Sequence, residues 1–133
     1  MVYSGLISFV TNPATSLNYF FVAFRPESKE ELKSAVDECI KTSPKGNCRD
    51  EPHGRIRDWD VSAVTDMASM FSSASEFNGD LSKWQVSSVT LMWYMFKGAS
   101  EFNKDLSKWD VSKVTDMQGM FLRAKKFNQD LSK

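Results

Sequence analysis

Asparagine and aspartate residues recur along the second half of the chain at a spacing that would align their oxygens in columns. Members of each series are 25 residues apart: Asn78, Asn103 and Asn128, and Asp80, Asp105 and Asp130. Calcium takes roughly six to eight oxygen ligands, so such columns are one candidate site. The alternative is that these side chains accept backbone hydrogen bonds in turns, where Asn and Asp are favoured. Because every unit carries the same residues, we favour the structural role and predict no metal ion or cofactor.

The two cysteines, Cys39 and Cys48, lie nine positions apart. In an exported protein they would close a short loop as a disulfide, whereas in a reducing compartment Cys39 would be a buried thiol on a helix. Both alternatives stay open at this point. Two cysteines and the single histidine, His53, are too few for a closed zinc site built from Cys and His alone. We interpret His53, between Pro52 and Gly54, as part of a turn.

No group of residues predicts catalysis. The sequence has no nucleophile motif, no glycine-rich phosphate loop and no constellation around its one histidine. Seventeen basic and seventeen acidic side chains cancel, so no excess of positive charge indicates nucleic-acid binding. The sequence therefore predicts a non-enzymatic protein that serves either as an interaction module or as a structural one.

Three copies of one 25-residue unit carry the recurring asparagines and aspartates. The copies begin at Trp59, Trp84 and Trp109, and fifteen of the 25 positions are identical in all three. A fixed period in this range is typical of stacked repeats. Recurring apolar positions should form interior columns, and the aromatic members of this predicted core are Trp59, Trp84, Trp109, Phe71, Phe96, Phe121, Phe77, Phe102 and Phe127.

When the unit is counted from its leucine, it fits the spacing of a leucine-rich repeat, for example at Leu81, Trp84, Val86 and Val89. Alternation around Gln85 predicts a short strand. The apolar residues from Met92 to Ala99 fall on one face of a short helix, which Thr90 would cap. The sequence thus predicts an α/β repeat solenoid over residues 56–133, with 25-residue turns of strand plus short helix.

Residues 26–55 are assigned to a cap helix and a polar loop. Ser28 and Glu31 form a predicted capping box, and Pro44 with Gly46 should end the helix. The apolar stripe of this helix contains Leu32, Ala35, Val36, Cys39 and Ile40. Such a helix would cover the apolar end of the first repeat.

Residues 1–25 form an apolar N-terminal segment. The segment has no charged residue before Arg25, so it lacks the basic region of a signal peptide. Asn12 and Pro13 interrupt it well short of the length of a membrane span. We predict no integral membrane span and expect the aromatic residues from Phe20 to Phe24 to pack onto the rest of the domain.

The join between the second and third copies carries a more specific resemblance. Its matching residues are Phe102, Asn103, Asp105, Leu106, Ser107, Trp109, Asp110, Val111, Ser112, Val114, Thr115, Met117, Met120, Phe121 and Ala124. This pattern resembles the BspA-like leucine-rich-repeat surface proteins. More narrowly, it resembles the lipoprotein-associated repeat domain of unknown function first named from mycoplasma surface proteins. The resemblance covers residues 56–133. It implies a solenoid at the cell surface, a role in adhesion and no catalytic residues.

Positions that differ among the copies are the candidates for binding a protein partner. On the expected strand face they are polar and lack aromatic anchors: Lys83, Gln85, Lys108 and Asp110. In the second copy, Leu91, Trp93 and Tyr94 replace small or polar residues beside the expected helix. These three side chains should either be covered by residues 1–24 or form an exposed patch that a partner uses.

The distribution of charge indicates an alternative function, a longer structural array whose pieces associate end to end. The first copy carries a net charge of −3 and the third copy +2. The third copy would also present an unpaired strand edge around residues 108–111. Attraction between exposed charges fades beyond roughly 8 Å at physiological salt, so we expect weak, salt-sensitive head-to-tail association.

Overall fold

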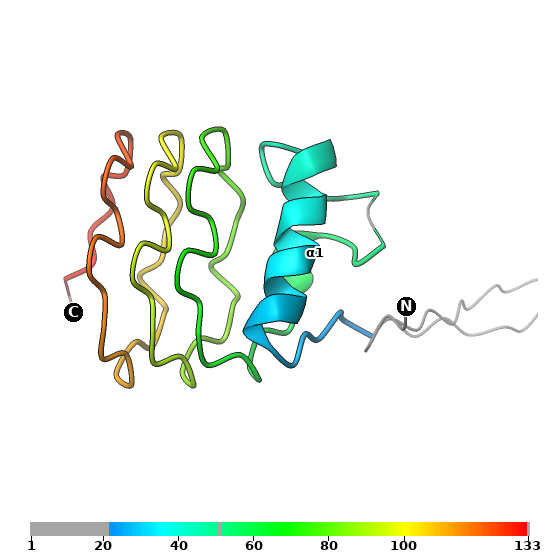
Figure 1. The fold of residues 1–133 in the computed structure, drawn as a ribbon, viewed down its shortest axis with the longest axis horizontal. Helices are drawn as coiled ribbons and strands as arrows, with labels where there is room; N and C mark the ends of the chain where they lie inside the picture. Colours follow the sequence, from blue (N-terminus) through cyan, green and yellow to red (C-terminus); the bar gives the residue numbers. More distant parts are fainter. Residues whose placement is uncertain (1–21, 51, 133) are drawn as a thin grey trace, which may run out of the picture.

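Three irregular coils, one from each copy, stand side by side, and a helix lies against the first of them (Figure 1). The computed structural model describes residues 22–50 and 52–132. Helix α1 spans Lys29–Thr42, and the 3-10 helix η1 spans Ile56–Asp58 and leads into the first coil. The coils are called the first copy (59–83), the second copy (84–108) and the third copy (109–133).

Helix α1 forms where the capping residues and the apolar stripe predict a helix. The Ser28 hydroxyl accepts the Glu31 N–H at 3.1 Å, and the Glu31 carboxylate accepts the Glu27 N–H at 3.0 Å. The side chains of Leu32, Ala35, Val36 and Cys39 are buried. The Ser43 N–H closes the last turn on the Cys39 carbonyl. Helix α1 therefore presents one apolar face to the first copy.

The prediction of an α/β repeat solenoid is wrong. Over the described residues the structure has one α-helix, one 3-10 helix and no strand. The coils share only isolated parallel bridges, between Asp66 and Leu91 and between Leu91 and Asp116. The segment 92–99, expected as a short helix, consists mainly of turns, and the expected strand around Trp84 and Val86 has no regular secondary structure.

The turns replace helices because alternate peptide groups point toward the neighbouring coil. In the first copy, four alternate N–H groups donate to second-copy carbonyls at 2.7–2.9 Å, from Met67, Ser69, Phe71 and Ser73. The second copy donates to the third in the same register. Intervening N–H groups close local turns, as Met70 does on the Met67 carbonyl. An α-helix would need each of these N–H groups to bond four residues back within its own segment.

Residues with positive φ make this alternation possible. Tyr94 has φ 54° and Gly98 has φ 73°, and the equivalent positions of the other copies share the left-handed conformation. A left-handed residue interrupts a right-handed helix. The spacing of Met92, Met95, Phe96 and Ala99 is nevertheless satisfied, because all four side chains are buried. The apolar pattern identified the interior face but not the backbone that presents it.

Aromatic columns fill the interior. Phe96 stacks on Phe71 and Phe121 at centroid distances of 5.4 and 5.6 Å, and Phe102 stacks on Phe77 and Phe127 at 5.8 Å each. Trp59, Trp84 and Trp109 are 3%, 2% and 4% exposed. The Trp84 indole N–H donates to the Ile56 carbonyl at 2.8 Å, and the Trp109 indole N–H donates to the Leu81 carbonyl at 3.0 Å. Each tryptophan thus ties its coil to the segment before it.

The apolar N-terminal segment enters the described structure at Val22. Phe24 is buried, packs against the Trp59 ring at 5.3 Å and accepts the Asp60 N–H on its carbonyl. Val22 is 39% exposed. The packing expected of Phe20 and Phe21 lies outside the described residues. No helix in the described part of the chain has the length and apolarity needed to cross a membrane.

Candidate interaction site

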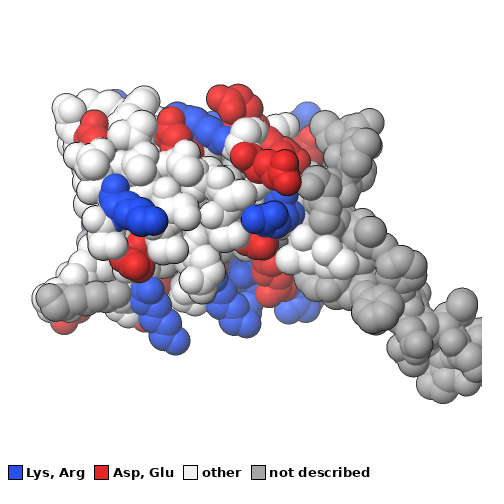
Figure 2. Space-filling view, turned by 90° about the horizontal axis from the view of Figure 1, so that it is seen from below, with Lys and Arg blue, Asp and Glu red and all other residues white. Residues whose placement is uncertain are grey.

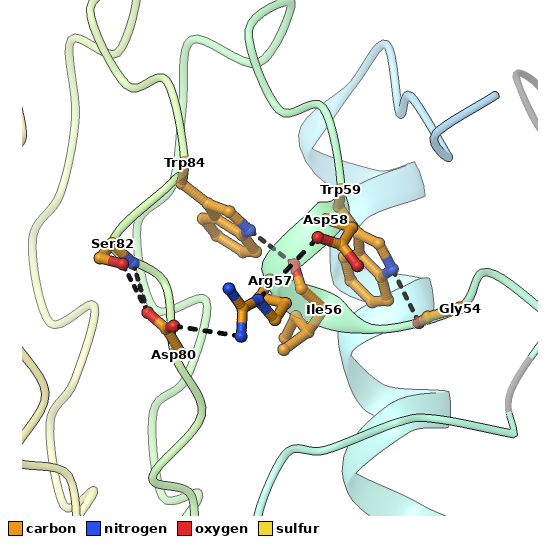
Figure 3. A network of polar contacts seen from close by, with 8 residues as sticks. All are labelled: Gly54, Ile56, Arg57, Asp58, Trp59, Asp80, Ser82 and Trp84. Atoms are coloured by element: carbon orange, nitrogen blue, oxygen red, sulfur yellow. Dashed lines mark hydrogen bonds and ion pairs between the residues drawn. The ribbon is translucent and has the colours of Figure 1, made fainter. Parts of the chain in front are cut away.

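The repeated aspartates bind their own backbone. Asp80 Oδ1 accepts the N–H and the hydroxyl of Ser82 at 3.0 and 2.7 Å (Figure 3). Asp60 and Asp130 accept the serine two positions later in the same way. The serine hydroxyl is the main cause that holds the pKa of each of these three carboxyls below its ordinary value. These aspartates therefore close turns.

The repeated asparagines and threonines link one coil to the next. Asn78 Oδ1 accepts the Asn103 N–H, and Asn103 Oδ1 accepts the Asn128 N–H, both at 2.9 Å. The N–H and hydroxyl of Thr90 both donate to the Thr65 carbonyl, so Thr90 caps no helix. Within residues 22–50 and 52–132, no group of three or more His, Cys, Asp or Glu side chains is arranged to hold a metal ion.

Cys39 and Cys48 form a disulfide with a Cα–Cα distance of 5.2 Å, and both residues are fully buried. The bond fixes the polar loop to the end of α1. The His53 side chain is also buried and packs on Phe24 at a ring distance of 3.9 Å. Its Nε2 lies 3.7 Å from the Glu38 carboxylate. These residues position the loop against α1 and the first copy.

The polar candidates Lys83, Gln85, Lys108 and Asp110 are exposed. Lys83 and Gln85 line a shallow hollow of about 260 Å³ together with residues 57–60. Lys108 and Asp110 occupy the same positions one coil further on. On the face seen in Figure 2, basic and acidic side chains are interspersed around uncharged surface. A surface of mixed sign without a desolvated anchor offers little binding energy.

Leu91, Trp93 and Tyr94, called here the aromatic ridge, are half-buried on the outside of the second copy. The Lys29 ammonium lies 5.2 Å from the Trp93 ring centre, and the Lys97 ammonium lies 4.7 Å from the Tyr94 ring centre. Both distances are within the range of a cation–π interaction. The two rings meet edge to face at 5.8 Å. The ridge is therefore a partly open aromatic surface flanked by two positive charges.

The backbone of the aromatic ridge is held on both sides. The Trp93 carbonyl accepts the Ser69 N–H, and the Tyr94 N–H donates to the Gln118 carbonyl, both at 2.9 Å. The Tyr94 ring lies over Gly119, where any side chain would overlap it. The predicted alternative that the N-terminal segment covers the ridge concerns residues 1–21, which lie outside the described residues. Sequence reasoning missed the contacts with Lys29 and Gly119. The second of these could have been found, because the third copy has a glycine, Gly119, at the position equivalent to Tyr94.

The two outer faces of the stack differ. Helix α1 covers the first copy, where Lys29 pairs with Asp66 and the Lys33 ammonium donates to the Met70 carbonyl, both at 3.3 Å. The third copy exposes Met117, Leu122 and Leu131 by 42–46%, beside a largely apolar cavity of about 240 Å³. No strand edge exists at residues 108–111, contrary to the prediction. Head-to-tail stacking on the first copy would have to displace α1.

Comparisons with curated proteins and with solved structures gave no match. One family model matches residues 42–133, which include the polar loop after α1 and all three copies. The family is described as a Mycoplasma protein of unknown function, DUF285, and the chain belongs to it.

Proposed function

We propose that this protein is a non-enzymatic protein-interaction module of the kind found in BspA-like surface proteins, and that the aromatic ridge binds its partner. The observation that carries the proposal is that the repeated polar side chains are engaged in hydrogen bonds within the fold, whereas the ridge side chains are partly exposed. The repeated Asp, Asn and Thr residues are occupied in turns and in bonds between coils. The aromatic ridge is not repeated, and its side chains are half-exposed.

The chemistry of the aromatic ridge indicates the kind of partner it would suit. Tryptophan and tyrosine are enriched at the centres of interfaces because they bury large areas at low entropic cost. Lys29 is already paired with Asp66, whereas the Lys97 ammonium beside the Tyr94 ring would offer positive charge to an acidic group on a partner. A partner segment with an apolar anchor beside acidic residues fits best.

Photo-crosslinking tests this proposal. A photoreactive phenylalanine analogue placed at position 93 should capture one discrete partner on cells that display the protein. The same analogue at position 75 is the control, because Ser75 is exposed, belongs to the first copy and is not a ridge residue. Equal capture from both positions, or none from either, would show that the ridge binds nothing specific.

We also propose a cell-surface location, which the family resemblance and the Cys39–Cys48 disulfide support. Disulfides persist in oxidising, extracellular environments and are rare in reducing ones. Acid quenching of intact cells followed by alkylation and mass spectrometry would report the thiol state in place. Protection of both cysteines from alkylation is expected. Complete alkylation of both would place the protein in a reducing compartment.

A second candidate function is a structural array that associates end to end. The exposed apolar surface of the third copy and the opposite net charges of the first and third copies favour it. Sedimentation velocity at low and high salt tests it, with oligomers expected only at low salt. A monomer at high concentration and low salt would exclude this alternative.

A further inference from the structure

Three of the five arginines in the chain line one cleft between the polar loop and the start of the repeats. The cleft has a volume of about 150 Å³, and its charged side chains are Arg49, Arg55, Arg57 and Asp80. The other two arginines, Arg25 and Arg123, do not line it. In a chain whose charges cancel, this is a local concentration of arginine residues.

Two of these arginines stand where the repeat has its turn-forming pair. Arg55-Ile56-Arg57 precedes Asp80-Leu81-Ser82 by one period of 25 residues. Ile56 keeps the interior role of Leu81, since it is 2% exposed and its carbonyl accepts the Trp84 indole N–H as the Leu81 carbonyl accepts that of Trp109. The residues on either side have changed from an acid and a hydroxyl to two positive charges. The core does not require that change.

The positive charge in the cleft is only partly neutralised. Arg57 lies between Asp58 and Asp80 at 3.9 and 4.0 Å, at the outer limit of an ion pair (Figure 3). Asp80 is also engaged by Ser82 through its other oxygen. Among the described residues, Arg49 and Arg55 form no ion pair. The cleft therefore keeps an excess of guanidinium over carboxylate.

The backbones that carry these arginines are fixed. Arg49 follows Cys48, which is joined to α1 by the disulfide. The Arg55 carbonyl accepts the Asp58 N–H at 2.9 Å and so begins η1, on which Arg57 lies. Guanidinium groups on fixed backbones lose less entropy when they converge on one ligand.

We propose that this cleft binds a phosphate or sulfate group. The planar guanidinium fork donates two parallel hydrogen bonds to an oxyanion, which a lysine ammonium does not reproduce. The cleft volume of about 150 Å³ leaves room for a tetrahedral oxyanion. The proposal does not depend on the aromatic ridge, because the two surfaces share no residue.

Titration of the full chain with inorganic phosphate and with sulfate, at constant ionic strength set by chloride, tests the proposal. The arginine side-chain N–H resonances are the readout, and saturable shifts of Arg49 and Arg55 are expected. Arg55→Gln and Arg49→Gln should each weaken binding at least about fivefold, as loss of charge-assisted hydrogen bonds requires. Arg123→Gln is the matched control, since Arg123 is exposed on the third copy, and it should leave binding unchanged.

A third titration, with a monosulfated monosaccharide, distinguishes a sulfate carried on a sugar from the free ion. Tighter binding than that of free sulfate assigns the cleft to a sugar-borne sulfate, and equal binding assigns it to the free ion. The proposal is overturned if chloride produces the same shifts as phosphate, or if Arg123→Gln weakens binding as much as Arg55→Gln. Melting temperatures of the variants serve as the folding check, and an unchanged affinity in a folded Arg55→Gln variant also overturns it.

Discussion

The interior columns and the aromatic ridge are carried by the same coils, yet they are held in different ways. Phe96, in a column, touches equivalent rings in the coils before and after it, and the same residue stands there in every copy. Trp93, on the ridge, has Ala68 and Gln118 as its equivalents and packs against Lys29 of α1. Stacking therefore constrains the columns to one residue type, whereas the ridge is free to differ from copy to copy.

The largest effect should come from breaking a column in the second copy. Trp84→Ala is expected to lower the free energy of unfolding by about 3–5 kcal/mol, since it removes a buried ring and leaves a cavity. It also removes the indole donor of the Ile56 carbonyl. Chemical denaturation followed by circular dichroism measures the loss. A variant as stable as the wild type would show that Trp84 is not an interior residue.

Two methionines at equivalent repeat positions show how much burial by adjacent coils contributes to stability. Met92 is fully buried, and its third-copy equivalent Met117 is 42% exposed. Met92→Ala should cost about 2–5 kcal/mol, as buried methionine truncations do. Met117→Ala should cost less than about 1 kcal/mol, as expected for a largely exposed site. Equal losses would contradict the claim that adjacent coils supply the burial.

Substitutions of two glycines test the contact between the ridge and the third copy. Both Gly98 and Gly119 have positive φ, so Gly98→Ala should cost roughly 1–2 kcal/mol through backbone strain alone. Gly119→Ala should cost more, because its new side chain would overlap the Tyr94 ring. In a Tyr94→Ser background the extra cost should disappear. Persistence of the extra cost there would mean that Tyr94 does not rest on Gly119.

A smaller effect should appear in acid. The pKa of Asp80 is lowered in the folded state, first by the Ser82 hydroxyl, from an ordinary value of 3.8. The turn's contribution is therefore complete above about pH 5 and is lost as pH falls through the folded-state pKa. Asp80→Asn should flatten the decline of melting temperature in acid, because it removes the carboxylate whose pKa is lowered. An unchanged decline in Asp80→Asn would argue against the turn.

The sequence was sufficient to predict helix α1 and the residues that face the interior. Ser28, Glu31 and the stripe from Leu32 to Cys39 act within one segment, so their pattern needs no tertiary information. The spacing from Met92 to Ala99 likewise identified buried side chains. The spacing of apolar residues within one segment shows which of its side chains are buried, and this spacing can be found without tertiary information.

The backbone of the coils could not be predicted from the same pattern. Helices of about nine residues are marginal alone, so bonds to a neighbouring coil can replace their internal bonds. Whether Phe71 bonds within its own segment or to the Met95 carbonyl depends on a coil 24 residues further along. The contact of Lys29 with Trp93 joins residues that lie even further apart in the sequence, which explains why the candidate site was only partly predictable.

The affinity of the partner for a variant that removes the ridge tests the central claim most directly. Trp93→Ala with Tyr94→Ser gives the second copy the residues of the first, Ala68 and Ser69, in a backbone that already holds serine at φ 59°. Calorimetric titration of the crosslinked partner should show an affinity at least about 30-fold weaker, as loss of an aromatic hot spot implies. The free energy of unfolding should change by no more than about 1 kcal/mol. Unchanged affinity in a folded variant, or unfolding of the variant itself, would contradict the account and make the ridge part of the fold.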